Sequence, residues 1–172
     1  MIAHRIKKIL ENEQFDCSNH HPDDLSDDLI VDLGNDKLER ERILEISCRP
    51  LQFSVHGVTA QQTDHSFNIQ FIVRLPYKVQ DLAATQLSSL LHFINHNIDW
   101  PGFDFDEVNN KVAYRYIWIT KDSAVDAPLL MNIVASVILC LDLFGETIEE
   151  VALGHATFDE VLQKITQFKP GV

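Results

Sequence analysis

Apolar and polar residues alternate most regularly over residues 66–75, SFNIQFIVRL. Every second residue is apolar from Phe67 to Leu75, and Ile72 is the single apolar residue at a position that the alternation assigns to the polar face. This period of two is typical of a half-buried strand in an antiparallel sheet. Pro76 follows and ends the strand.

A second alternating region covers residues 103–119 and predicts a β-hairpin. Asn109-Asn110 can form a two-residue turn because Asn tolerates positive φ. With that turn, Phe105 faces Tyr114, Phe103 faces Tyr116 and Asp104 faces Arg115. One side of the hairpin is then aromatic (Phe103, Phe105, Tyr114 and Tyr116), and all four rings are expected to point inward. The other side carries an ion pair beside Ile117 and Ile119, worth about 0.2–1 kcal/mol.

The segment 22–33 allows two interpretations. Pro22 followed by acidic residues is typical of a helix start, whereas Leu29, Val31 and Leu33 alternate before Gly34-Asn35-Asp36, as in a strand entering a hairpin turn. The strand is slightly favoured because residues 43–48 alternate again and can pair back across that turn. Arg49-Pro50 then bends or ends this strand.

Helical periodicity appears in three further regions. Residues 2–10 carry one apolar stripe, a helix from about 81 to 98 carries another, and 129–144 is apolar on nearly all sides. Thr147 with Glu150 and Thr157 with Glu160 match the capping box, with Gly154 as a terminator between them, so two short helices are expected to close the chain. The pattern predicts an α+β fold, with helices on an antiparallel sheet of about five strands, in a single domain over residues 1–172.

The acidic residues are concentrated in one region. The net charge is −12, and residues 11–36 hold nine acidic residues and no Lys or Arg. A negative field disfavours nucleic acid and anionic membranes as partners. The apolar run 129–144 is interrupted by polar residues and shorter than the roughly 20 residues of a membrane span. With three cysteines that lack paired spacing, we expect a soluble, cytoplasmic protein with reduced thiols.

Candidate chemistry is sparse. His92 and His96 are four residues apart on a predicted helix, a spacing at which two imidazoles can reach one metal, but they lie opposite the apolar stripe and lack an HExxH glutamate. The acidic stretch His20–Asp28 offers oxygen ligands without the Gly and Glu of a Ca²⁺ loop. No G-x-S-x-G motif or Gly-rich phosphate loop occurs. We therefore expect neither catalysis nor a cofactor.

The order of elements resembles one known family. A strand ending in LP (IQFIVRLPYKV), a helix ending in LLHFINHNI, the segment GFDFDEVNNKVAYRYIWI, a long apolar helix and EEVALG resemble the YbjN-like family. That family is described as bacterial sensory transduction regulators and has the fold of type III secretion chaperones. The similarity covers about residues 66–154. It implies helices packed on a curved antiparallel sheet and a protein-binding role.

The positions that match the family are Asn95, Gly102, Phe103, Asp106, Arg115 and Gly154. We predict a non-enzymatic protein-interaction module, chaperone-like or regulatory, that binds a segment of an unidentified partner protein. A homodimer is compatible with this prediction. The candidate partner-binding or structural residues are Asn95, Gly102, Asp104, Asp106, Arg115, Ile117 and Ile119. The alternative is a small-ligand or metal-binding protein that uses His92, His96 and the acidic N-terminal segment.

Overall fold

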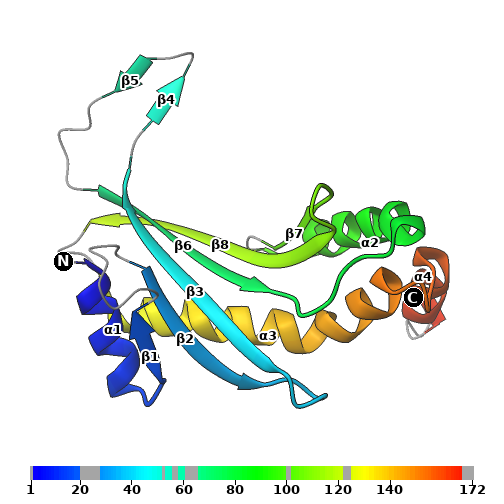
Figure 1. Cartoon of the computed structure of the whole chain (residues 1–172), viewed down its shortest axis with the longest axis horizontal. Helices are drawn as coiled ribbons and strands as arrows, with labels where there is room; N and C mark the ends of the chain where they lie inside the picture. The colour runs from blue at the N-terminus through cyan, green and yellow to red at the C-terminus, as the bar shows by residue number, and fades with distance from the viewer. Residues whose placement is uncertain are drawn as a thin grey trace. The chain divides into compact units, whose positions relative to one another are not determined.

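A six-stranded antiparallel sheet and four α-helices make up the α+β architecture of the computed structural model, which describes residues 2–19, 28–51, 53–55, 58–60, 66–99, 102–121 and 125–167 (Figure 1). The strand order is β1-β2-β3-β6-β8-β7, and a separate two-stranded sheet pairs β4 with β5. The elements are α1 (Ile2–Asn12), β1 (Cys17–Asn19), β2 (Asp28–Asn35), β3 (Glu41–Pro50), β4 (Phe53–Val55), β5 (Val58–Ala60), β6 (Ser66–Arg74), the 3₁₀ turn η1 (Asp81–Ala83), α2 (Ala84–Asn97), β7 (Phe103–Asp106), β8 (Lys111–Lys121), α3 (Ala127–Ala152) and α4 (Phe158–Gln167).

The sheet has six strands where the sequence predicted about five. Strand β1 has three residues, too few to show an alternating pattern, and it pairs with β2 through Cys17 opposite Val31. The prediction of a strand through Leu29, Val31 and Leu33 is confirmed by β2, which continues to Asn35. Residues 22–27 of that ambiguous segment lie outside the described residues.

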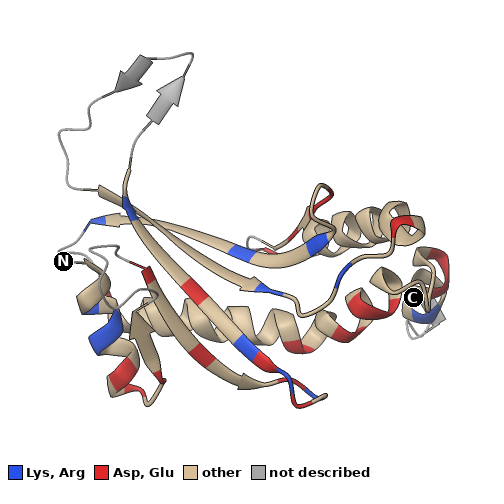
Figure 2. Ribbon diagram, in the orientation of Figure 1, with Lys and Arg blue, Asp and Glu red and all other residues tan. Residues whose placement is uncertain are grey.

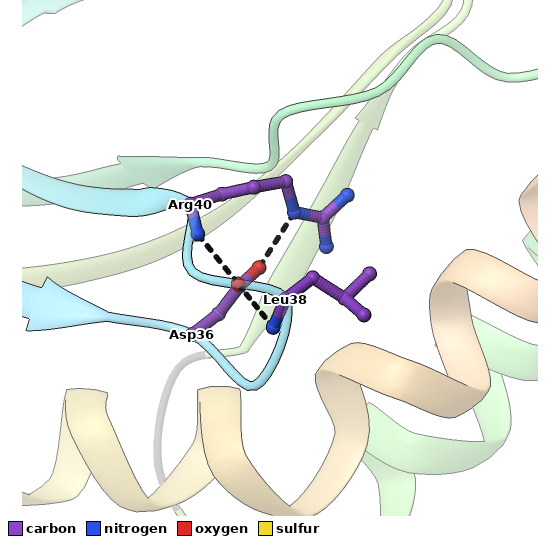
Figure 3. Close-up of polar contacts among 3 residues, drawn as sticks. All are labelled: Asp36, Leu38 and Arg40. Carbon is purple, nitrogen blue, oxygen red and sulfur yellow. Dashed lines mark hydrogen bonds and ion pairs between the residues drawn. The ribbon is translucent and has the colours of Figure 1, made fainter.

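The β2–β3 hairpin turns over residues 36–40, after Asn35 has paired with Glu41. The turn therefore starts two residues later than the predicted Gly34-Asn35-Asp36, and a register shift lies between Asp32 and Asn35. Figure 3 shows the turn. Asp36 Oδ1 accepts hydrogen bonds from the N–H groups of Leu38 (2.8 Å) and Arg40 (2.9 Å), and its Oδ2 accepts one from Arg40 Nε (2.7 Å). Burial raises the pKa of the Asp36 carboxyl, but the hydrogen bonds from Arg40 and Leu38 outweigh it and place that pKa below its ordinary value.

Close contacts divide the chain into two compact units. Unit 1 comprises residues 1–73 and 115–137, and unit 2 comprises residues 74–114 and 138–172. Strands β6 and β8 and helix α3 each contribute to both units.

The core of unit 1 lies on one face of its strands. Val31, Leu44 and Val73 are directly opposite one another across β2, β3 and β6, as are Leu29, Ile46 and Phe71, and all six are buried. Helix α1 contacts β1, β2 and β3 and buries Ile2, Ile6 and Leu10. Its apolar stripe therefore covers this face, which we call the inner face.

Aromatic rings form much of the core of unit 2. The Phe103 ring meets Tyr114 edge to face, with centroids 5.2 Å apart, and meets Phe144 of α3 at 6.2 Å. Helix α2 contacts β7 and α4, and Phe93 lies 6.0 Å from Phe158. Four apolar residues on one side of α2 are buried, as its periodicity predicted: Leu87, Leu90, Leu91 and Ile94.

The predicted register of the β7–β8 hairpin is wrong by two residues. Phe103 faces Tyr114, Phe105 faces Val112, and Asp104 faces Ala113 instead of Arg115. The connection runs over the four residues 107–110 rather than Asn109-Asn110 alone, because Asp106 accepts hydrogen bonds from the N–H groups of Val108 (3.0 Å) and Asn109 (3.1 Å). An Asx-type turn thus replaces the two-residue turn.

Helix α3 is longer than predicted. It continues through Thr147 to Ala152, so the capping box expected at Thr147 and Glu150 lies inside a 26-residue helix and starts no new one. Gly154 ends α3 at φ +71°, and Thr157 with Glu160 forms the second capping box through hydrogen bonds of 2.8 and 3.3 Å. One short helix, α4, follows instead of two. By length and composition α3 could cross a membrane, which the shorter run 129–144 did not indicate.

Candidate partner-binding surface

The outer face of unit 1 carries apolar side chains in positions where a solvated sheet would be polar. Ile30, Glu45 and Ile72 are directly opposite one another across β2, β3 and β6, one residue out of step with the buried rows of the inner face. Ile30, Ile43 and Ile72 are only partly covered. Ile72 is the residue that broke the alternation in the sequence, and the fold gives it this outward position.

Strand β8 extends the apolar face with its two isoleucines, Ile117 and Ile119. The Tyr116 ring packs edge to face on Phe71, with centroids 6.1 Å apart, so Tyr116 lies on the inner face. Successive side chains point to opposite faces, which places Ile117 and Ile119 on the outer face. Their exposed fractions are 40% and 56%, well above those of the buried core.

The same part of β8 lies at an edge of the sheet. Strand β7, the last strand in the order, pairs with β8 only from Lys111 to Tyr114. The Val112 carbonyl accepts a hydrogen bond from the Leu75 N–H (2.9 Å), beyond the end of β6. Because alternate residues direct their N–H and C=O groups to opposite sides, those of Ile117 and Ile119 point to the edge that β7 leaves uncovered among the described residues.

Positive charge brackets these two isoleucines. Arg115 and Lys121 are exposed and share the outer face with Ile117 and Ile119 by alternation, and no charged residue lies between them. Figure 2 shows this pattern as basic segments of β8 separated by an uncharged stretch. We call residues 115–121, with their outer side chains and edge backbone, the β8 edge.

Two of the predicted site residues, Asn95 and Gly102, instead join α2 to β7 in unit 2. Asn95 Nδ2 donates to the Phe103 carbonyl (2.8 Å), and Asn95 Oδ1 accepts from the Phe103 N–H (2.9 Å), so the end of α2 fixes the start of β7. A Cβ on Gly102 would overlap the Asn95 amide and lie 2.8 Å from its Cγ. Only glycine fits there without displacing that side chain.

The two aspartates of β7 have different roles. Asp106 Oδ2 accepts a hydrogen bond of 2.6 Å from Asn109 Nδ2, and hydrogen bonds from Asn109 and Val108 hold the pKa of the Asp106 carboxyl below its ordinary value. Asp106 therefore organises the turn. Asp104 is exposed on β7 opposite Ala113. Of the seven predicted residues, Arg115, Ile117 and Ile119 are together in unit 1, and Asn95, Gly102, Asp104 and Asp106 belong to unit 2.

The histidine pair has the geometry of neighbouring residues on a helix. The rings of His92 and His96 are 6.5 Å apart and nearly parallel at 21°, and both residues are exposed as predicted. Within the described residues, no three His, Cys, Asp or Glu side chains are grouped to hold a metal ion. Most of the acidic stretch, residues 20–27, lies outside them.

The three cysteines are buried, and no disulfide joins any two of them. Burial raises the pKa of the Cys17 thiol to about 11, with smaller contributions from Glu11 and Asp16. A thiol with this pKa is almost fully protonated at pH 7, which disfavours a role as nucleophile.

Comparison with known proteins adds no assignment. A scan against models of protein families finds no match to the chain, and a search of curated proteins finds none either. Function is therefore inferred from the residues and their arrangement.

Proposed function

We propose that this chain is a non-enzymatic protein-interaction module that binds an extended segment of a partner protein at the β8 edge. One observation carries the proposal: Ile117 and Ile119 combine exposed apolar side chains with backbone hydrogen-bonding groups at a strand edge that β7 leaves unpaired in the described part of the chain. An added strand gains main-chain hydrogen bonds from such an edge and specificity from alternate side chains. The resemblance to YbjN-like and secretion-chaperone-like proteins supports a protein-binding role of this kind.

The surrounding surface supports the same role. Proteins protect strand edges with charged residues, prolines or covering elements, because an exposed apolar edge pairs with other chains. Ile30, Ile43 and Ile72 extend the apolar area away from the edge across β6, β3 and β2. A partner that adds a strand can therefore also place apolar side chains over this face. Apolar residues on a sheet face that contacts only water would have no such role.

The test compares three immobilised proteins: the parent, the double variant Ile117→Ser/Ile119→Ser, and Ile165→Ser as a matched control. Ile165 is a suitable control because its exposed fraction, 43%, is close to the 40% of Ile117, and it belongs to α4. Proteins retained from cell extract are quantified by mass spectrometry. We expect the double variant to retain at least about tenfold less of a partner that the parent and the control retain, because removal of central apolar anchors has effects of this size.

Folding must be measured alongside binding. Because both isoleucines are exposed, the double variant should keep the parent's circular dichroism spectrum and unfold within about 1 kcal/mol of it. Equal retention by all three proteins would contradict the proposal. So would a partner whose capture depends on Ile165 alone.

A further inference from the structure

The exposed side of α2 carries two histidines at a spacing suited to metal binding. His92 and His96 are four residues apart, so their side chains are neighbours on one side of the helix. Both are exposed, and their rings lie nearly parallel at 21° with centroids 6.5 Å apart. Within the described part of the chain, no hydrogen bond or ion pair occupies either imidazole. Their ring nitrogens are therefore available to a ligand.

The backbone that carries this pair is held by the core of unit 2. Leu91 and Ile94, from the same two turns of α2, are buried. The two hydrogen bonds between Asn95 and Phe103 fix the end of the helix to β7. A ligand site on a packed helix keeps its geometry better than a site on a loop. Binding of an ion by the two histidines therefore requires only their exposed side chains to move.

The distance between the two rings allows one ion to bind both. Metal–nitrogen bonds of about 2.0–2.1 Å place the centroids of two imidazoles on one tetrahedral ion about 5 Å apart. The centroids of His92 and His96 are 6.5 Å apart, so the rings must approach each other by roughly 1.5 Å to meet that geometry. Rotation between staggered side-chain conformations covers such a distance, and it disturbs no core packing because both rings are exposed.

We infer that His92 and His96 form a two-imidazole site for a divalent transition-metal ion, with water in the remaining coordination positions. Imidazole suits Cu²⁺, Ni²⁺ and Zn²⁺, and Cu²⁺ binds most tightly to a given set of nitrogen ligands. Mg²⁺ and Ca²⁺ need oxygen ligands and do not fit this site. Since the described residues bring no third His, Cys, Asp or Glu to the pair, the site differs from a closed structural zinc centre and exchanges its other ligands with solvent.

The position of the pair favours a cation. His96 lies in the last turn of α2, where the aligned peptide groups give the helix a negative end. The net charge of −12 also raises the concentration of cations near the protein. Both effects favour any cation, so selectivity for a transition metal comes from the two imidazoles. The site belongs to unit 2 and does not depend on the β8 edge, which belongs to unit 1.

The experiment measures binding of Ni²⁺ to the full chain by isothermal titration calorimetry at neutral pH. His92→Gln and His96→Gln each remove one ligand, and His155→Gln removes another exposed histidine as the matched control. We expect the parent and the control to bind one Ni²⁺ ion that His92→Gln and His96→Gln bind at least about tenfold more weakly, because the second imidazole adds to the ion as an intramolecular ligand. An excess of Mg²⁺ should not displace this ion.

The double variant His96→Asn/Asn97→His keeps the composition and changes only the spacing. It places the two imidazoles about 140° apart around the helix instead of about 40°, so that one ion cannot reach both. We expect the same loss as for His96→Gln, with an unchanged circular dichroism spectrum. If the exchange disturbs folding, the two Gln variants decide the outcome, because Gln favours helices.

Three results would overturn the inference. The first is Ni²⁺ binding that survives the exchange or depends on only one of the two histidines. The second is displacement of Ni²⁺ by Mg²⁺, which would indicate a site of oxygen ligands. The third is the absence of saturable Ni²⁺ binding to the parent.

Discussion

The two halves of β8 differ in what covers them. From Lys111 to Tyr114 the strand pairs with β7, and its inner residues Val112 and Tyr114 are completely buried. From Arg115 to Lys121 the β7 pairing has ended, and Ile117 and Ile119 are exposed. One continuous strand thus pairs with β7 in its first half and has no pairing with β7 in its second.

The residues at outward positions reflect this difference. The outward positions in the covered half are Lys111 and Ala113, and Ala113 is small and adds little apolar surface. The outward positions in the uncovered half are Arg115, Ile117, Ile119 and Lys121, and the two isoleucines between the charges are β-branched and large. A strand that needed only solubility would place charged residues at those positions, as edge strands commonly do. Exposed isoleucines at these positions are what the proposed binding of a partner segment requires.

The largest effect should come from the covered half. Tyr114→Ala removes a fully buried ring that packs against Phe103, and the cavity should lower the free energy of unfolding by about 3–5 kcal/mol. Ile119→Ala, in the uncovered half, should lower it by less than about 1 kcal/mol. Urea denaturation of both variants measures the difference. Equal losses would show that the second half is covered in solution.

A smaller but substantial effect is expected where α2 joins β7. Gly102→Ala should lower the free energy of unfolding by about 1–3 kcal/mol, because the added methyl group displaces the Asn95 amide from its two hydrogen bonds to Phe103. In an Asn95→Ala background, the same change should have a much smaller effect. A double-mutant cycle in urea measures this coupling. Additive losses would exclude the clash as the cause.

The sequence predicted the elements better than their junctions. The strand over residues 66–74 and the stripe of α2 followed from periodicity, because burial of one face imposes that period directly. The β7–β8 register did not, because two adjacent asparagines also suit a longer turn, and the choice depends on the Asp106 hydrogen bonds. Local chemistry of this kind decides a register that periodicity alone leaves open by two residues.

The candidate surface was only partly predictable. Arg115, Ile117 and Ile119 were identified as neighbours on one face, and the structure places them together in unit 1. Ile30 and Ile43 were missed, since each could equally belong to a strand buried on both faces. Ile72 was visible as an exception to its pattern, and two such exceptions on neighbouring strands would have indicated an apolar outer face. The strand order was needed to identify the part of β8 that does not pair with β7.

The β2–β3 turn gives a pH-dependent prediction of intermediate size. Asp36→Ala should lower the free energy of unfolding at pH 7 by about 1 kcal/mol through loss of hydrogen bonds. Since the folded pKa lies below the unfolded value of about 3.9, the stabilisation by Asp36 is complete at neutral pH and is lost as pH falls through the folded pKa. Thermal unfolding from pH 7 to pH 3 measures it. Glu41→Gln, an exposed change on β3, is the control, and an identical pH profile for Asp36→Ala and the parent would contradict the prediction.

The smallest effect on stability returns to β8 and isolates its uncovered half. Ile119→Thr keeps the β-branched shape and replaces an exposed methylene and methyl group with a hydroxyl that water can solvate, so unfolding should change by less than about 0.5 kcal/mol. Val112→Thr makes the matched change at a fully buried position in the covered half, where an unsatisfied hydroxyl costs about 1–3 kcal/mol. Urea denaturation measures both variants. If Ile119→Thr costs as much as Val112→Thr, the second half of β8 is enclosed in the free protein and cannot be the surface that waits for a partner.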